Sequence, residues 1–249
     1  MSSSALPALA PDTLDLLRKV STATLTTVLF KRGLRNTFLQ GVRLLGSGGR
    51  QMAGPAYTMR YIPAREDLDH LGVFLDHGHP QRKGVEEIPP GHVLVMDSRG
   101  DASAASAGSI LVARMMVRGV EGVVTDGGLR DSHEIAALAI PTYFQAPSAP
   151  TNLIKHHAVD LNVPIGCGGV AVYPGDVVVG DAEGVVVIPR GIADDVARES
   201  TSQTEFEDFV TEQVLGGRGI FGLYPPTDPA TQGQFEAWRA QRRAGKGSA

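Results

Sequence analysis

The chain has 249 residues, of which 42% are hydrophobic and 20% charged, a composition typical of a folded globular protein and not of a disordered one. The 23 Lys and Arg residues against 27 Asp and Glu residues give a net charge of -4, which supplies no overall basic surface for a nucleic-acid backbone. Cys167 is the single cysteine, so the chain forms no internal disulfide and no cysteine-rich zinc site.

These features predict a cytoplasmic protein that binds neither nucleic acid nor membrane. Gly, Pro or charged residues interrupt every hydrophobic stretch before it reaches the roughly 18 residues of a membrane helix. Residues 1–11 are rich in Ser, Ala and Pro and carry no cationic head before an apolar run. We therefore expect a flexible N-terminal tail and no signal peptide.

Residues 12–32 carry apolar side chains at helical spacing and predict a helix that breaks near Ser21, with Asp12 or Ser21 as its N-cap. Short apolar runs then predict strands, and a helix is expected at 110–118 between two of them, which makes a βαβ-like unit. The segment 76–90 is predicted to be a loop, and His156-His157 is expected to lie in a helix. The predicted strands are 57–61, 93–96, 123–125, 142–144, 170–173, 177–179 and 185–188.

The last part of the chain predicts a hairpin over 177–188 and then an amphipathic helix over 192–214. Residues 216–249 mix Gly and Pro with a basic end and are predicted to be a C-terminal tail that packs on a neighbouring subunit. No repeat or composition break divides the chain. We expect one α/β domain over residues 12–215 with two tails.

The segment 127–131 follows a predicted strand with two glycines, which give the backbone room to approach a ligand. Arg130 can present a planar fork to a carboxylate or keto oxygen, and Asp131 can bind a hard cation. The alternative is a surface turn with a neighbouring ion pair. Together these residues predict a catalytic and metal-binding pair at a strand end.

Small residues at 104–111 lead into the predicted helix, whose first N–H groups can hold an anion such as a substrate carboxylate. Gly108, Ser109, Ile110 and Leu111 are the expected substrate-binding residues. The alternative is an ordinary N-cap by Ser106 or Ser109.

Other polar residues favour structural interpretations. His77 and His79 lack a third ligand at a recognised metal spacing, and adjacent His156 and His157 point in different directions on a helix. Cys167 has no base partner nearby in the sequence and is expected to be a small buried residue. The acids Asp181 and Glu183 flank a hairpin turn and are assigned structural roles.

Four segments together resemble the family that joins 4-hydroxy-4-methyl-2-oxoglutarate aldolases to the regulator of ribonuclease activity A. The resemblance covers roughly residues 14–214. It implies a swivelling β/β/α (RraA-like) domain, homotrimers or homohexamers, and an active site between neighbouring subunits. The segments that carry it are 54–58, 90–97, 119–131 and 174–189.

Aldolases of this family resemble one another in an Asp, twenty residues and then Arg-Asp, with a divalent cation such as Mg²⁺ or Mn²⁺ on the last Asp and waters. Arg130 and Asp131 match, but the twenty residues 110–129 place Ser109 where the family has its first Asp. A neutral hydroxyl supplies no charge and no base near neutral pH. The resemblance thus implies a metal on Asp131 with a changed water shell.

The resemblance implies a lyase that cleaves a 2-keto acid, by aldol cleavage or oxaloacetate decarboxylation, through a pyruvate enolate. Two alternatives stay open: a dehydratase or isomerase of a keto-deoxy sugar acid on the same scaffold, and a non-catalytic regulator that binds a ribonuclease. Asp101, Asp126 and Glu134 are unranked candidates for proton exchange, and residues 205–212 for a ligand supplied to a neighbouring subunit.

The stretch 60–83 is longer and more polar than the family core needs. It predicts a binding region for a polyhydroxylated acid, against the alternative of a solvated loop. Its candidate residues are Arg60, Arg65, His77, His79, Gln81 and Arg82.

Overall fold

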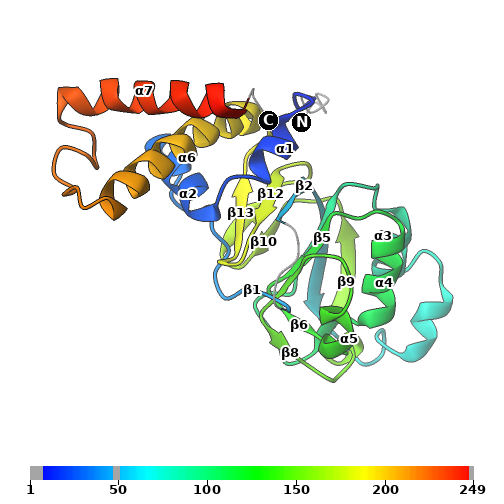
Figure 1. Ribbon diagram of the computed structural model, residues 1–249. Coiled ribbons are helices and arrows are strands. Elements are labelled where there is room, and N and C mark those ends of the chain that lie inside the picture. The colour runs from blue at the N-terminus through cyan, green and yellow to red at the C-terminus, as the bar shows by residue number, and fades with distance from the viewer. Residues whose placement is uncertain (1–7, 47–50, 247–249) are drawn as a thin grey trace.

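The computed structural model describes residues 8–46 and 51–246, and a mixed sheet forms the centre of the fold (Figure 1). Its strands follow the order β1-β7-β5-β3-β2-β12-β13, with β9 paired to β2. The strands are β1 (Arg43–Leu44), β2 (Met52–Pro63), β3 (Val93–Asp97), β5 (Gly122–Thr125), β7 (Thr142–Phe144), β9 (His156–Leu161), β12 (Val177–Gly180) and β13 (Val185–Ile188).

Strand β2 belongs to two parts of this sheet. Its first half pairs antiparallel with β12, from Met52 opposite Gly180 to Pro55 opposite Val177. Its second half pairs parallel with β3 and antiparallel with β9. The parallel strands β3 and β5 are almost wholly buried, which explains their continuous apolar sequences because helices or further strands cover both faces.

Two layers cover the parallel part of the sheet. On one side lie α3 (Pro80–Glu87), α4 (Ser109–Val117) and α5 (Ser132–Ala136), whose buried side chains form one core with β2, β3 and β5. On the other side the hairpin β10 (Ile165–Cys167) and β11 (Val170–Val172) closes a second core. This arrangement confirms the predicted α/β single-domain fold.

The N-terminal helices and the last strands form a third core. The expected break near Ser21 is present between α1 (Thr13–Leu17) and α2 (Thr22–Lys31), and Ser21 caps α2 by accepting a hydrogen bond from the Thr24 N–H. Both helices pack with β12, β13 and α6 (Ala193–Leu215). Residues 1–7 of the expected tail lie outside the described residues, whereas Ala10 already donates its N–H to the Asp194 carboxylate.

The segment after α6 contains a helix that the sequence analysis did not predict. Helix α7 (Pro229–Lys246) runs beside α6, and the pair extends away from the sheet (Figure 1). Phe209 of α6 packs against Phe235 and Trp238 of α7. Contact of this segment with a neighbouring subunit stays a prediction.

Acidic side chains of α6 are engaged within the same chain. Glu205 pairs with Arg239, Asp208 with Arg242, and Glu212 accepts from the Trp238 indole N–H. In the described structure, three of the acids of 205–212 that we considered as ligands for a neighbour therefore hold α7, and the fourth, Glu207, accepts from the Thr24 hydroxyl of α2.

Two other predictions of local structure were wrong. The segment 76–90 is not a loop throughout, because it contains α3, whose buried residues are Gln81, Gly84 and Val85. His156 and His157 begin strand β9 and lie on no helix.

Within the described residues, no helix has the length and apolar character needed to cross a membrane.

A small parallel sheet beside the main one places the candidate site. Strand β6 (Gly128–Leu129) lies between β4 (Ala105–Ala107) and β8 (Ala146–Pro147). Because β4 leads directly into α4 and β6 leads directly into Arg130-Asp131, the sheet brings the two predicted segments side by side.

Candidate functional site

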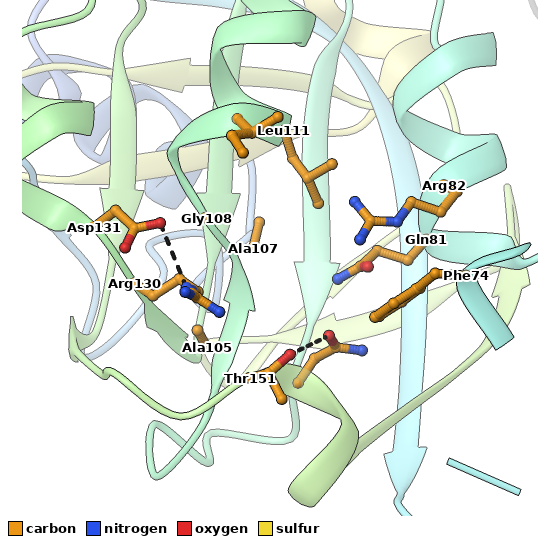
Figure 2. A pocket seen from close by; sticks show the side chains of 12 residues that line it. Phe74, Gln81, Arg82, Ala105, Ala107, Gly108, Leu111, Arg130, Asp131 and Thr151 are labelled. Atoms are coloured by element: carbon orange, nitrogen blue, oxygen red, sulfur yellow. Dashed lines mark hydrogen bonds and ion pairs between the residues drawn. The ribbon is translucent and has the colours of Figure 1, made fainter. Parts of the chain in front are cut away.

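The two predicted segments, 104–111 and 127–131, contribute residues to the lining of one cavity of about 180 Å³ (Figure 2). This is smaller than the roughly 300–1,000 Å³ of pockets for drug-sized ligands, so the cavity suits a small molecule. One side, which we call the motif wall, consists of lining residues within 105–111 together with Arg130 and Asp131. The opposite side, which we call the α3 wall, consists of Phe74, Gln81 and Arg82. Thr151 lies between the walls, and the adjacent Asn152 also lines the cavity.

Backbone contacts fix Arg130 and Asp131. The Arg130 N–H donates to the Ala107 carbonyl at 3.1 Å, which extends the β4–β6 pairing by one residue. Asp131 has a φ of 55° as it begins α5, a left-handed conformation that Asp tolerates better than most residues. The Arg130 Nε and Asp131 Oδ2 are 3.4 Å apart, and both side chains are about half exposed at 46% and 37%. The predicted pair is therefore next to the cavity and accessible.

The start of α4 faces the same carboxylate. Asp131 Oδ2 is 3.4 Å from both the N and the Oγ of Ser109. The Leu111 N–H already donates to the Gly108 carbonyl, whereas the Ile110 N–H has no partner among the described residues. The Ile110 amide is therefore free to hold an anion, and Gly108, Ile110 and Leu111 all line the cavity.

Glycines make this close packing possible, though not in the way that the sequence suggested. A Cβ on Gly108 would lie 2.9 Å from Arg130 Cγ and 3.0 Å from Asp131 Oδ2. Gly127 and Gly128 leave no room for a ligand, because a Cβ there would lie 2.5 Å from Ser98 Cβ and 2.6 Å from Ser148 Cβ respectively. The room that we expected beside these two glycines is filled by the protein itself.

The α3 wall contains two of the six residues proposed from the 60–83 stretch. Gln81 and Arg82 line the cavity. Arg60 pairs with Asp160 and Arg65 with Asp67, and neither lines it.

His77 is exposed, and His79 is buried against Phe74. Burial lowers the pKa of His79, and the nearby Arg82 lowers it further. Phe74, Thr151 and Asn152 were missed, since no local pattern marks residues that meet only in the folded chain.

None of the three proton-exchange candidates lines the cavity. Asp126 is buried and accepts backbone N–H groups from Ser98, Gly100 and Gly168 at 2.7, 3.0 and 3.2 Å; burial nevertheless raises its pKa. Asp101 bonds to Ser103, which lowers its pKa, and Glu134 is exposed in the first turn of α5. None of these acids is therefore part of the cavity wall, and their role in proton exchange stays a prediction.

The donor set around the cavity suits a hard cation. Asp131 is the only acid among the described lining residues, and residues 8–46 and 51–246 hold no group of three or more His, Cys, Asp or Glu that could bind a metal. Mg²⁺ is commonly bound through one or two carboxylates, with waters and substrate oxygens completing its shell. One exposed carboxylate beside a cavity fits that mode and does not fit a closed zinc site.

The remaining candidates have structural environments. His156 donates from its Nε2 to the Ala104 carbonyl and accepts at its Nδ1 from the Arg99 guanidinium, whereas His157 pairs with Asp69. Cys167 is buried, and burial raises the pKa of its thiol. Asp181 accepts hydrogen bonds from the Thr22 N–H and hydroxyl at the start of α2, consistent with the structural role predicted for it.

Comparison with known proteins agrees with this architecture. A family model described as RraA-like, aldolase/RraA, matches residues 21–187. The chain belongs to the RraA-like family. A Halalkalibacterium halodurans protein named "Putative 4-hydroxy-4-methyl-2-oxoglutarate aldolase" is 35% identical over 165 residues, which are 66% of this chain and 72% of that protein.

Solved structures share this fold. Streptomyces coelicolor RraAS2, described as an unusual member of the RNase ES inhibitor RraA family, is 29% identical with a TM-score of 0.72, covering 82% of this chain and 98% of that one. An uncharacterized Pseudomonas syringae protein shares the fold with a TM-score of 0.74 at 22% identity, over 88% of this chain and 99% of that one. RraA-like relatives are thus named both for aldolase activity and for ribonuclease inhibition.

Proposed function

We propose that the protein is a divalent-metal-dependent lyase that cleaves a 2-keto acid, by aldol cleavage or by decarboxylation of oxaloacetate. The observation that carries the proposal is the convergence of Arg130, Asp131 and the first turn of α4 on one small cavity. The similarity to a protein named as an aldolase supports the same reaction class. The resemblance also supports a homotrimer or homohexamer in the cytoplasm.

Arg130 and the start of α4 bind the keto-acid end of the substrate in this proposal. The planar guanidinium of Arg130 donates to the carboxylate and keto oxygens. The free Ile110 N–H, at a helix N-terminus, adds a donor to the same carboxylate. These donors hold the substrate while negative charge grows on the keto oxygen, which is the condition under which fixed donors accelerate a reaction.

Asp131 would hold the cation, with the Ser109 hydroxyl positioned to bond a water of its shell. When bound, Mg²⁺ or Mn²⁺ supplies Lewis-acid stabilisation of the developing enolate charge. In aldol cleavage the C3–C4 bond breaks, its electron pair moves toward C3 and the keto oxygen, and the C4 hydroxyl loses its proton. C3 then takes up a proton to give pyruvate. Solvent is the proton carrier we assign, because Asp101, Asp126 and Glu134 lie outside the cavity.

The test is pyruvate release from oxaloacetate and from 4-hydroxy-4-methyl-2-oxoglutarate, measured with Mg²⁺, with Mn²⁺ and with chelator. We expect metal-dependent release that Asp131→Ala abolishes and that Asp160→Ala retains, since Asp160 is comparably exposed but pairs with Arg60 outside the cavity. No release from either substrate in the wild-type protein would overturn the proposal. Conversion of a keto-deoxy sugar acid without pyruvate release would support the dehydratase or isomerase alternative.

A regulator of ribonuclease activity is the second candidate. The observation in its favour is the likeness to RraAS2, which covers 98% of that chain. Inhibition of an RNase E-type ribonuclease by the wild-type protein and equally by Asp131→Ala, without pyruvate release, would support this function.

A further inference from the structure

The α3 wall places a second arginine opposite Arg130. Arg82 lies in the first turn of α3, and Figure 2 shows its guanidinium directed into the space that Arg130 enters from the other side. Both residues line the same cavity. The cavity therefore has a cationic group at each end.

Arg82 has no anionic partner among the described residues. Other arginines near this region are paired, Arg60 with Asp160, Arg65 with Asp67 and Arg114 with Glu86. The guanidinium of Arg82 instead lies over the Phe74 ring, 4.2 Å from its centroid. Burial lowers the pKa of Arg82, because the cation is partly removed from water without a compensating charge.

Gln81 ties the α3 wall to the motif wall. Its Nε2 donates to the Ser106 carbonyl at 2.7 Å and lies 3.3 Å from the Tyr61 hydroxyl. Ser106 belongs to β4, only two residues before Gly108. The Gln81 side chain is buried, and its Oε1 has no partner among the described residues, a situation that is uncommon in folded proteins.

An arginine that is partly removed from water and has no anionic partner among the described residues is suited to bind an anion. Since Arg130 and the α4 amides take up the keto-acid end, the anion at Arg82 belongs to the other end of the same molecule. We propose that Arg82 binds a second anionic group, carboxylate or phosphate, at the far end of the substrate and that Gln81 positions it. Arg82 then selects 2-keto acids with two anionic ends over those with one. This inference rests on the proposed function for the orientation of the substrate.

Binding can test the selection without turnover. Calorimetric titration compares 2-oxoglutarate with 2-oxopentanoate, which carries a methyl group in place of the far carboxylate. We expect the wild-type protein, with Mg²⁺ present, to prefer the diacid by about 10- to 100-fold, the range for a hydrogen-bonded charged group. Arg82→Ala should remove this preference and leave 2-oxopentanoate binding unchanged. Arg65→Ala, an exposed arginine outside the cavity, is the matched control.

A second pair of probes distinguishes the two anions. The members of this pair, 2-keto-3-deoxy-6-phosphogluconate and 2-keto-3-deoxygluconate, differ by a phosphate on the far hydroxyl group, so the pair tests a far phosphate as the first pair tests a far carboxylate. The anion with the larger Arg82-dependent preference is the one that the site takes. Equal affinity for both members of both pairs in the wild-type protein, or a preference that persists in Arg82→Ala, would overturn the inference.

The two proposals fail separately. Absence of pyruvate release together with an Arg82-dependent preference would contradict the lyase reaction and keep the anion subsite. Pyruvate release with no Arg82-dependent preference would support the lyase reaction and contradict the anion subsite. Gln81 acts through Arg82, so its variants should raise KM for a two-anion substrate and leave kcat unchanged.

Discussion

The motif wall and the α3 wall face one cavity but hold their functional groups by different means. Arg130 and Asp131 follow a strand whose neighbours are fixed by backbone hydrogen bonds and by glycines that admit no side chain. Arg82 depends on one ring contact and on the side-chain hydrogen bonds of its neighbour Gln81. Backbone contacts thus hold the reaction end of the cavity, at Arg130 and Asp131, whereas side-chain contacts hold the selecting end, at Arg82. A substitution can therefore change the selecting end without disturbing the reaction end.

The largest effect is expected from Gly108→Ala on the motif wall. The new methyl group would lie within 3.0 Å of both Arg130 and Asp131, so both must move. The side chains must shift by a few tenths of an ångström, and because a displacement of about 1 Å at a reacting centre can cost roughly 100-fold in rate, we expect kcat for pyruvate release to fall by about tenfold. Gly166→Ala, where a Cβ meets nothing within 4 Å, is the control. An unchanged kcat in Gly108→Ala would show that the motif wall is not rigid.

A smaller effect is expected from Gln81→Met on the α3 wall. This change keeps the length of the side chain but removes the hydrogen bond to Ser106, worth about 1 kcal/mol. We expect KM for 4-hydroxy-4-methyl-2-oxoglutarate to rise about fivefold, as that energy implies, with kcat retained. Steady-state kinetics measure both, and Gln232→Met on exposed α7 is the control. A fall in kcat without a change in KM would mean that the two walls are not separable.

The stability of the folded protein should depend on pH through His156. His156 contacts the carbonyl of Ala104, the residue just before the motif wall, and burial lowers the pKa of His156 below the usual 6.5. The unfolded chain therefore binds the proton more readily, so stability is full above about pH 6.5 and is lost as the pH falls below that value.

We expect Tm to drop between pH 7.5 and pH 5.5, and to drop less in His156→Gln. Thermal unfolding at the two pH values measures the difference, and exposed His77→Gln should follow the wild-type protein. An identical drop in His156→Gln would exclude His156 as a source of the pH dependence.

The smallest effect is expected from Arg60→Ala. Arg60 pairs with Asp160 across β2 and β9, and both side chains are exposed to solvent at 43% and 36%. Such a pair contributes about 0–1 kcal/mol, and neither residue lines the cavity. Steady-state kinetics should give unchanged kcat and KM. A raised KM would extend the selecting region beyond the α3 wall.

The sequence predicted those strands and helices whose buried side chains follow a regular pattern along the chain. Residues 93–96 and 185–188 are continuous apolar runs because both faces of their strands are buried, and such runs are visible without a structure. Helix α3 was missed because its buried positions are Gln81, Gly84 and Val85, of which only one is a large apolar residue. Its sequence therefore shows no apolar periodicity.

The candidate site was partly predictable for a similar reason. Arg130 and Asp131 follow a recognisable strand end and match the family motif, and the small residues before the predicted helix indicated Gly108 to Leu111. Their contact with α3 depends on strands of two or three residues, too short for any periodic pattern. The selecting end of the cavity is therefore a property of tertiary packing, and sequence reasoning reached Arg82 only as one of six candidates.

The long strand β2 also bears on how the protein is made. Its second half can pair with β3 soon after synthesis, but Met52 to Pro55 must wait for Val177 to Gly180. Until those residues leave the ribosome, this half presents an unpaired strand edge, the kind of surface that joins other chains. The nascent chain should therefore depend on chaperones until β12 has emerged, and ribosome-bound chains that end before Val177 should aggregate more readily than chains that end after β13.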